Sequence, residues 1–285
     1  MTGEPDPDAL EADYEAIRRD GVLRVTRSGT DAPTEWLSTG WHGGRKRADC
    51  AYNVSVPEGW ERTDLERYVG ERLDRAGVDA PDAADRGPVL LTGVDMADAR
   101  GARCGPVTAY ATAGISNPAA LPIGEALEAS ESDPDGESLP DPLEARTESP
   151  EPGTVNVLVG TTRTLAPGAL ANLVAVAAEA KAATLLAEAG FPGTTTDAVV
   201  VGHDPTGDPR SFSGSATEVG AATRACVREA VGASLEAHYA DRDETLPDSS
   251  EDAIYGVSTD ARAAVFRPNA EEPPGAEPDI SGDRS

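Results

Sequence analysis

Short hydrophobic segments separated by polar or glycine-rich turns run through most of the chain. Several alternate hydrophobic and polar positions, which is the period of a strand with two different faces. The pattern predicts strands at 21–26, 34–39, 50–56, 88–94, 106–115, 153–160 and 197–202. Residues 41–47, rich in glycine and basic residues, predict a turn, and 256–266 could add an edge strand.

Other segments repeat hydrophobic residues at helical spacing. The predicted helices are 6–20, 63–77, 167–190 and 216–239. The helix at 167–190 has Pro167 at its start and Gly190 at its end, which is the usual order of these residues at helix ends. The helix at 63–77 has Thr63 as its expected N-cap.

A strand-rich first half followed by a mixed second half predicts the α+β class. We expect a single domain in which long helices pack on a mixed β-sheet. The main domain is predicted at 21–240, after an acidic N-terminal arm at 1–20. Residues 125–152 are rich in proline, serine and acids, which predicts a disordered insertion, and 241–285 predict an acidic tail.

The charge excludes some partners. Asp and Glu number 51 against 24 Lys and Arg, giving a net charge of -27 that is concentrated in the arm, the insertion and the tail. Nucleic acids and anionic membrane surfaces are therefore not expected as partners. There is no run of about 18 apolar residues, as a membrane-spanning helix would need, and no signal peptide is visible, so the cytoplasm is the expected location.

Three cysteines are widely spaced, at Cys50, Cys104 and Cys226. Their number and spacing indicate neither a disulfide framework nor a metal site. Small buried residues are a more frequent role for such cysteines than a catalytic thiol.

Two charges interrupt the otherwise apolar helix at 167–190. Glu179 and Lys181 are two residues apart, so they do not face one another. Lys181 falls on the apolar stripe, where an unpaired ammonium would be costly to bury. It is therefore a candidate functional group, or it extends to solvent or pairs with an acid elsewhere.

Asparagine recurs in or beside predicted strands, where it is disfavoured, at Asn53, Asn117 and Asn156. A turn role is the simpler interpretation of Asn117, because Pro118 follows it. A buried amide needs hydrogen-bond partners from the protein or from a ligand. As a set, the three could line a pocket that binds amides.

The remaining candidates are single polar residues. Asp197 precedes a strand and Asp95 lies in a similar setting; turn chemistry is the alternative to a catalytic role for both. His42, in the glycine-rich turn, could transfer protons near neutral pH or be an exposed loop residue. His203 and His238 carry weaker signals. The common hydrolase, phosphate-loop, dinucleotide and zinc motifs do not occur.

Five blocks, in order, resemble the adenosylcobinamide amidohydrolases of the CbiZ type. They are LSTGWHGGRKRADCAYNVSV, LLTGVDMADA, VTAYATAGISNPAALPIG, GTVNVLVGTTRTLAPGALANLVAVAAEAKAATLL and GTTTDAVVVG. The resemblance spans about 21–238 without the acidic insertion. A chain with many acids and only two lysines also resembles proteins of halophilic archaea.

The resemblance implies hydrolysis of the amide between the corrin side chain and aminopropanol of adenosylcobinamide. The product, adenosylcobyric acid, would enter cobalamin salvage. The corrinoid is then the substrate rather than a cofactor, and no cofactor is expected. No ligand spacing suggests a bound metal, but metal dependence is left open, as is a homo-oligomer. Two alternatives remain: a non-catalytic corrinoid-binding or carrier protein, and a different amidohydrolase on the same scaffold.

Amide hydrolysis needs a base, an oxyanion stabiliser and a proton donor. We expect Asp197 or Glu179 to activate water, Lys181 or Asn156 to stabilise the oxyanion, and His42 to donate the proton. The expected substrate-binding residues are Asn53, Asp95, Ser116, Asn117, Asn156 and Thr195. Many relatives carry a basic, histidine-containing stretch where this chain has SGSATEVG at 213–220, with Ala216 and Glu218 at its polar positions. That departure is what favours the carrier alternative.

Overall fold

The computed structural model describes residues 14–268 except 30–31, 58–62, 79–85, 124–152, 241–244, 248, 251 and 254–255. The helices are α1 (Leu65–Arg75), α3 (Pro167–Ala189) and α4 (Glu218–Ala240), with a 3-10 turn, η2, at Met96–Asp98. The longer strands are β1 (Tyr14–Arg19), β2 (Val22–Arg27), β3 (Thr34–Ser38), β4 (Gly44–Ala48), β5 (Cys50–Ser55), β6 (Val89–Thr92), β7 (Arg100–Cys104), β8 (Val107–Ala113), β10 (Val155–Thr161) and β12 (Ala198–His203). The short ones are β9 (Ala119–Ala120), β11 (Thr164–Leu165), β13 (Pro209–Arg210) and β14 (Val257–Ser258).

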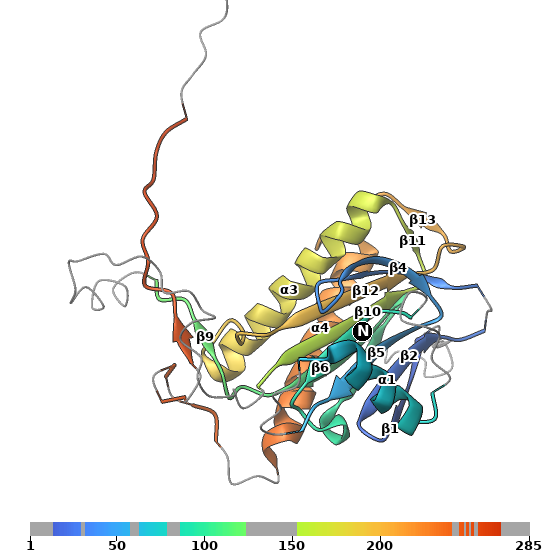
Figure 1. The fold of residues 1–285 in the computed structure, drawn as a ribbon. Helices are drawn as coiled ribbons and strands as arrows, with labels where there is room; N and C mark the ends of the chain where they lie inside the picture. The colour runs from blue at the N-terminus through green and yellow to red at the C-terminus, as the bar shows by residue number, and fades with distance from the viewer. Residues whose placement is uncertain are drawn as a thin grey trace, which may run out of the picture.

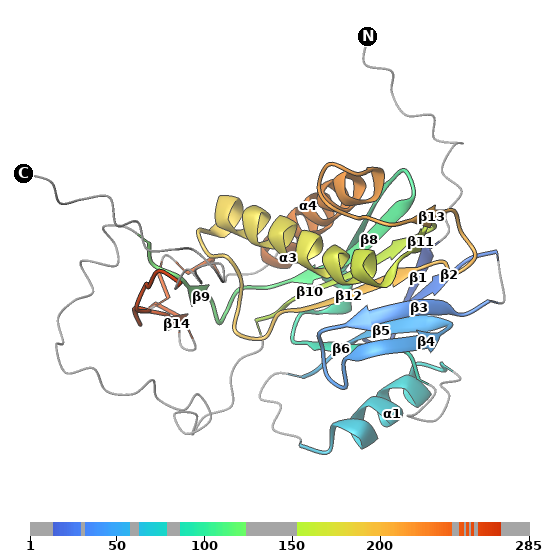
Figure 2. The same cartoon turned by 90° about the horizontal axis from the view of Figure 1, so that it is seen from above.

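Two sheets and three helices form four layers (Figures 1 and 2). The six-stranded sheet has the order β4-β3-β12-β10-β8-β7 and is mixed, because β10 and β12 are parallel while their other neighbours are antiparallel. The four-stranded sheet has the order β1-β2-β5-β6. In Figure 2 α3 and α4 cover one side of the six-stranded sheet, and α1 lies beyond the four-stranded sheet. This confirms the predicted α+β class and adds a second sheet to it.

Strand β10 lies at the centre and is buried along its whole length. Successive side chains of a strand point to opposite faces. Val157 and Val159 therefore belong to the core under α3 and α4, whereas Leu158 belongs to the core between the two sheets. Because both faces are covered, the strand reads as a continuous apolar segment with Asn156 as its one polar interruption before Gly160.

Helix α3 connects the parallel strands β10 and β12 and packs against β12 and α4. Pro167 opens it, and Gly190 ends it in the left-handed conformation at φ 77°, as predicted. By length and composition α3 could cross a membrane, but half of its most apolar stretch is buried inside the protein. A core helix of this kind passes the same test, so the feature is weak evidence for a membrane span.

Two predicted elements differ from the structure, and strand β7 was not predicted. Residues from 14 onward within the expected helix at 6–20 form β1, which pairs antiparallel with β2, and 6–13 lie outside the described residues. Asp20 and Gly21 join the strands with φ of 48° and 70°, the pattern of a tight hairpin turn. Pairing with β2 and burial of Tyr14 outweigh the weak helical pattern. The expected turn at 41–47 also continues into a strand, β4.

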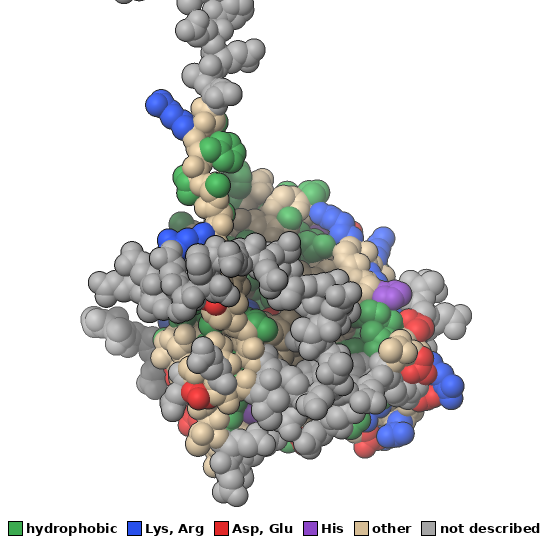
Figure 3. Space-filling model, turned by 60° about the vertical axis from the view of Figure 1, so that its left-hand side comes forward, with side chains coloured by type: hydrophobic (Ala, Val, Ile, Leu, Met, Phe, Trp, Pro, Cys, Tyr) green, Lys and Arg blue, Asp and Glu red, His purple; other side chains and the backbone are tan. Residues whose placement is uncertain are grey.

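The other predicted strands and helices are confirmed to within a few residues. The N-cap of α1 is Asp64 rather than Thr63, and 256–266 contributes only β14, paired with β9. The insertion at 125–152 and most of the arm and tail lie outside the described residues, so the predicted domain boundaries stay predictions. On the face shown in Figure 3, acidic and basic side chains of the described part adjoin one another toward its right-hand side.

Candidate functional site

Polar side chains gather where β8 ends and β10 and β12 begin. The ends of these strands are joined by backbone hydrogen bonds, from Gly114 N to Thr154 O at 3.4 Å and from Thr195 N to Asn117 O at 3.2 Å. The turn after β6 and the last turn of α4 adjoin the same place. We call this region the candidate edge; it comprises residues 92–98, 112–117, 153–156, 194–197 and 234–239.

Lys181 on α3 and Asp197, just before β12, form a largely buried ion pair. The Lys181 ammonium contacts Asp197 Oδ2, and their side chains are 9% and 13% exposed. Asp197 also accepts hydrogen bonds from Val155 N at 2.9 Å, Thr194 N at 3.0 Å and Thr194 Oγ1 at 2.5 Å. The pair therefore ties α3 to the starts of β10 and β12. Of the interpretations open for Lys181, pairing with a distant acid is the one observed.

Glu179 does not join this pair. Its side chain is 63% exposed and its carboxylate lies 3.7 Å from Arg224 Nη1 on α4. Residues two apart on a helix point in widely different directions, as expected. Glu179 therefore lies on the outer surface between the two long helices.

Asn53 and Asn156 meet between the two sheets. Asn156 Nδ2 donates to Asn53 Oδ1 at 3.0 Å and to the Leu91 carbonyl at 2.8 Å. Asn53 Nδ2 donates to Thr112 Oγ1 at 2.9 Å. Both asparagines are fully buried, and the Oδ1 atom of Asn156 has no hydrogen-bond partner among the described residues. Their amides thus join the two sheets behind the candidate edge.

Asn117 lies in a separate part of the edge, beside the threonine loop. Its Nδ2 donates to Thr195 Oγ1 at 2.6 Å, while its Oδ1 is buried and has no hydrogen-bond partner in the described part of the chain. Gly153 packs directly on this segment, since a Cβ there would lie within 2.6 Å of Asn117 Oδ1 and closer still to Ser116. Ser116 and Thr195 are both partly exposed. The structure therefore brings Ser116, Asn117 and Thr195 together, as a substrate-binding set would require.

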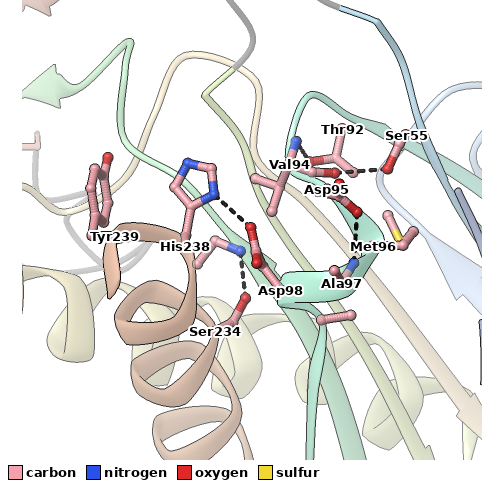
Figure 4. A network of polar contacts seen from close by, with 12 residues as sticks. Ser55, Thr92, Val94, Asp95, Met96, Ala97, Asp98, Ser234, His238 and Tyr239 are labelled. Atoms are coloured by element: carbon pink, nitrogen blue, oxygen red, sulfur yellow. Dashed lines mark hydrogen bonds and ion pairs between the residues drawn. The ribbon is translucent and has the colours of Figure 1, made fainter. Parts of the chain in front are cut away.

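A histidine–carboxylate pair completes the edge (Figure 4). His238 projects from the last turn of α4, and its Nδ1 lies 3.0 Å from Asp98 Oδ2 in η2. Both side chains are 14% exposed. A Cβ added at Gly114 would come within 2.9 Å of His238 Nε2, so the ring lies against the end of β8. A carboxylate on one ring nitrogen holds an imidazole in the orientation that proton transfer needs.

Sequence reasoning gave His238 little weight and did not single out Asp98. His238 is 140 residues from its partner, and no spacing rule connects a helix end with a short turn so far away. The only local signal was a histidine in the final turn of an amphipathic helix, which also suits the helix dipole.

Asp95 has a local structural role. Its Oδ1 accepts a hydrogen bond from Ala97 N at 2.8 Å and caps η2. The carboxylate is exposed beside the dyad of His238 and Asp98. Turn chemistry, one of its two interpretations, is therefore present, and the cap holds Asp98 in place.

His42 lies in a different cavity, at the turn between β3 and β4. The cavity has a volume of about 240 Å³ and is also lined by Trp41, Lys46, Glu66 and Arg86. The His42 residue is exposed and adopts a left-handed backbone, at φ 50°. The structure thus does not unite His42 with the polar groups of the candidate edge.

Two of the cysteines are shielded and one is exposed. Burial raises the pKa of the Cys226 thiol to about 12 and also raises the pKa of Cys50. Cys104 is exposed on β7. The interpretation as a small buried residue is confirmed for Cys226, and Cys104 departs from it.

The segment 213–220 forms the opposite end of α4 from His238. Ser213 Oγ donates to the Ala169 carbonyl at 2.6 Å, and Gly220 N donates to Thr217 Oγ1 at 3.0 Å. Glu218 pairs with Arg163 at 3.0 Å, and this hydrogen bond holds its pKa below the usual value. Glu218 and His238 are about 30 Å apart along the helix axis.

Comparison with known proteins identifies the chain's relatives. The sequence family described as CbiZ, adenosylcobinamide amidohydrolase, matches residues 11–243. The chain belongs to this family. It is 56% identical over 255 residues to the adenosylcobinamide amidohydrolase of Halobacterium salinarum, covering 90% of this chain and 100% of that protein. It is 28% identical over 212 residues to that of Methanosarcina mazei, covering 71% of this chain and 90% of that protein.

Family membership confirms the resemblance drawn from the five sequence blocks and the expected amidohydrolase class. Solved structures are more distant. The PH0078 protein from Pyrococcus horikoshii covers 77% of this chain and 78% of its own at 12% identity, with a TM-score of 0.38. A Burkholderia beta-aminopeptidase covers 77% and 79% at 15% identity, with a TM-score of 0.37. These scores are too low to transfer any residue role.

Proposed function

We propose that this amidohydrolase cleaves the amide bond between the corrin side chain and aminopropanol in adenosylcobinamide. The products are adenosylcobyric acid, which re-enters cobalamin synthesis, and the free amino alcohol. Membership of the family and the 56% identity with the Halobacterium salinarum protein support this substrate. One observation supports hydrolysis at the candidate edge, namely the imidazole of His238 held by Asp98.

Water is the nucleophile in the proposed reaction. His238 takes a proton from water as the oxygen adds to the amide carbon, and it delivers that proton to the leaving nitrogen as the C–N bond breaks. Asp98 orients the ring and stabilises its charged form. The role of proton donor, which the sequence suggested for His42, thus passes to His238, which also replaces Asp197 and Glu179 as the base.

The ion pair of Lys181 and Asp197 positions the threonine loop rather than reacting. Asp197 already receives donors from Lys181, Thr194 and Val155, which leaves little capacity to activate water. The loop in turn holds Thr195 against Asn117. We assign Ser116, Asn117 and Thr195 to binding the carboxamides of the corrin edge, with Asn53 and Asn156 supporting them from behind. Asp95 supports Asp98.

The carrier alternative loses its main argument. It rested on Ala216 and Glu218, but their segment lies at the far end of α4 from the dyad. A missing basic group there does not remove a group from the candidate edge. We also propose a cytoplasmic enzyme that uses no cofactor and binds neither nucleic acid nor membrane.

Mass spectrometry of adenosylcobinamide incubated with the protein in molar KCl tests the proposal. We expect adenosylcobyric acid and aminopropanol in equal amounts, with no change after treatment with EDTA. Binding of the corrinoid by folded protein without release of aminopropanol would contradict hydrolysis and restore the carrier alternative. Release of amines from other amides with adenosylcobinamide left intact would indicate a different amidohydrolase.

A further inference from the structure

The cavity beside His42 is lined by more cationic than anionic described side chains, although the chain as a whole is strongly acidic. Two cationic side chains, Lys46 and Arg86, line it together with a single carboxylate, Glu66. Glu66 is already occupied, because its Oε1 accepts from Arg86 Nη1 at 2.8 Å. Among the described residues that line it, this cavity therefore has an excess of positive charge, in a chain with 51 acidic residues against 24 basic ones.

Both cations retain unused hydrogen-bonding capacity. Arg86 is 8% exposed, and its Nε has no hydrogen-bond partner among the described residues. A buried donor of this kind is unfavourable unless something accepts from it. The Lys46 ammonium contacts only the Arg86 carbonyl, at 3.5 Å, and forms no ion pair within the described part of the chain. Together they present donors to an anion.

Two aromatic rings also line the cavity. The rings of Trp41 and His42 are 4.3 Å apart between centroids and tilted by 58°. His42 holds this place with a left-handed backbone, which a residue other than glycine rarely adopts. The next residue cannot bear a side chain, since a Cβ on Gly43 would lie 2.5 Å from the Ser38 carbonyl oxygen. The backbone of this turn therefore places the rings of Trp41 and His42 at the cavity.

We propose that this cavity binds a small ligand that joins a phosphate to a flat ring through a sugar, of the nucleoside monophosphate class. Lys46 and Arg86 bind the phosphate, and the ring packs on Trp41. Phosphate accepts several charge-assisted hydrogen bonds at once, which matches the unused donors better than a neutral ligand does. At about 240 Å³ the cavity is too small for a corrin ring. The site is distinct from the candidate edge.

Binding of AMP, measured by titration calorimetry without corrinoid at one fixed KCl concentration, tests the proposal. We expect saturable binding, competition by inorganic phosphate and much weaker binding of adenosine. Lys46→Met should raise the Kd about tenfold or more, because a hydrogen bond to a charged group is lost. Glu66→Gln should lower the Kd, because it removes the one carboxylate among the described residues that line the cavity.

Two further variants control for folding and for general charge. His42→Gly relieves the left-handed backbone, so it should fold at least as well as the parent chain and still raise the Kd roughly threefold through loss of the ring. Arg67→Gln removes an exposed cation that pairs with Glu71 on the same helix, and it should leave the Kd unchanged. Circular dichroism verifies folding of each variant.

The proposal is wrong if the parent protein shows no saturable binding of AMP. It is equally wrong if adenosine binds as tightly as AMP, or if Lys46→Met and Arg67→Gln change the Kd alike. None of these results depends on whether adenosylcobinamide is hydrolysed, so the two proposals fail separately.

Discussion

The two ends of the six-stranded sheet each place a histidine beside an acid, yet the two histidines differ in their surroundings. At the candidate edge, His238 meets Asp98 with both side chains 14% exposed. At the other end of β12, about 20 Å away, His203 is 4% exposed and lies 3.4 Å from Glu35. His203 Nδ1 also accepts from Leu165 N at 3.2 Å. A backbone partner and deep burial make His203 part of the scaffold.

The comparison shows that a histidine next to an acid is not sufficient to indicate a catalytic site. What distinguishes the two ends is the exposure of the histidine side chain, 4% for His203 and 14% for His238, and the neighbourhood that each ring faces. His203 holds β11 in place through Leu165 N, whereas His238 lies against Gly114, two residues before Ser116 at the end of β8.

Removing each histidine should separate the two ends most strongly. We expect His238→Ala to lower kcat for aminopropanol release by about 10²–10⁴-fold, the usual contribution of general acid–base catalysis. His203→Ala should leave kcat nearly unchanged and lower the free energy of unfolding by about 1–3 kcal/mol, because Leu165 N loses its acceptor. Equal losses of kcat in both variants would remove the distinction.

Asp98→Asn should lower kcat for aminopropanol release and shift the pH profile of kcat.

The two charges on α3 offer a matched test of stability. Lys181→Met should lower the free energy of unfolding by about 3–5 kcal/mol, because it leaves the Asp197 carboxylate buried without its cation. Glu179→Gln should change it by less than about 0.5 kcal/mol, because that side chain is exposed. Urea denaturation at fixed KCl measures both. A large loss in Glu179→Gln would show that the contact with Arg224 matters more than its exposure suggests.

The amide contact between the sheets should have an intermediate effect. Asn156→Ala removes the donor to Asn53 Oδ1 and to the Leu91 carbonyl, which should lower the free energy of unfolding by about 1–3 kcal/mol. Asn172→Ala is the control; this residue is exposed on α3 and, among the described residues, its Nδ2 donates only to Ser213 Oγ, at 3.2 Å, so the change should cost much less. If Asn156→Ala instead keeps full stability while KM rises sharply, the amide binds substrate rather than joining the sheets.

The smallest effect is expected at the start of α4. Arg163 holds the pKa of Glu218 below its usual value near 4.5, so the pair stabilises the fold at higher pH. That contribution is lost as the pH falls through the lowered pKa. Glu218→Gln should therefore lower the free energy of unfolding by less than about 1 kcal/mol at pH 7, with no difference from the parent at strongly acidic pH and unchanged kcat. A loss of kcat would indicate that the segment 213–220 contributes to catalysis.

Local patterns were sufficient for most of the secondary structure. The boundaries of α3 follow from Pro167 and Gly190, whose backbone preferences act within one turn of the helix. The helix expected at 6–20 failed because the Asp20–Gly21 turn and pairing with β2 decide the conformation of that segment.

The candidate site could be predicted only in part. Lys181, Asp197 and the three asparagines stood out because each is polar in an apolar setting, and such residues need partners wherever the chain folds. The sequence does not show which partner each of these residues contacts. Lys181 meets Asp197 across 16 residues, and Asn53 meets Asn156 across 103.

By itself, then, the sequence determined the family, the α+β class, the two long helices and the polar residues that had to be satisfied. The tertiary structure alone decided that there are two sheets, that His238 meets Asp98, and that His42 belongs to another cavity. The physical reason is the distance along the chain over which each effect acts. Propensity, capping and periodicity act over a few residues, whereas packing of sheets and pairing of buried polar groups depend on contacts between segments far apart in the chain.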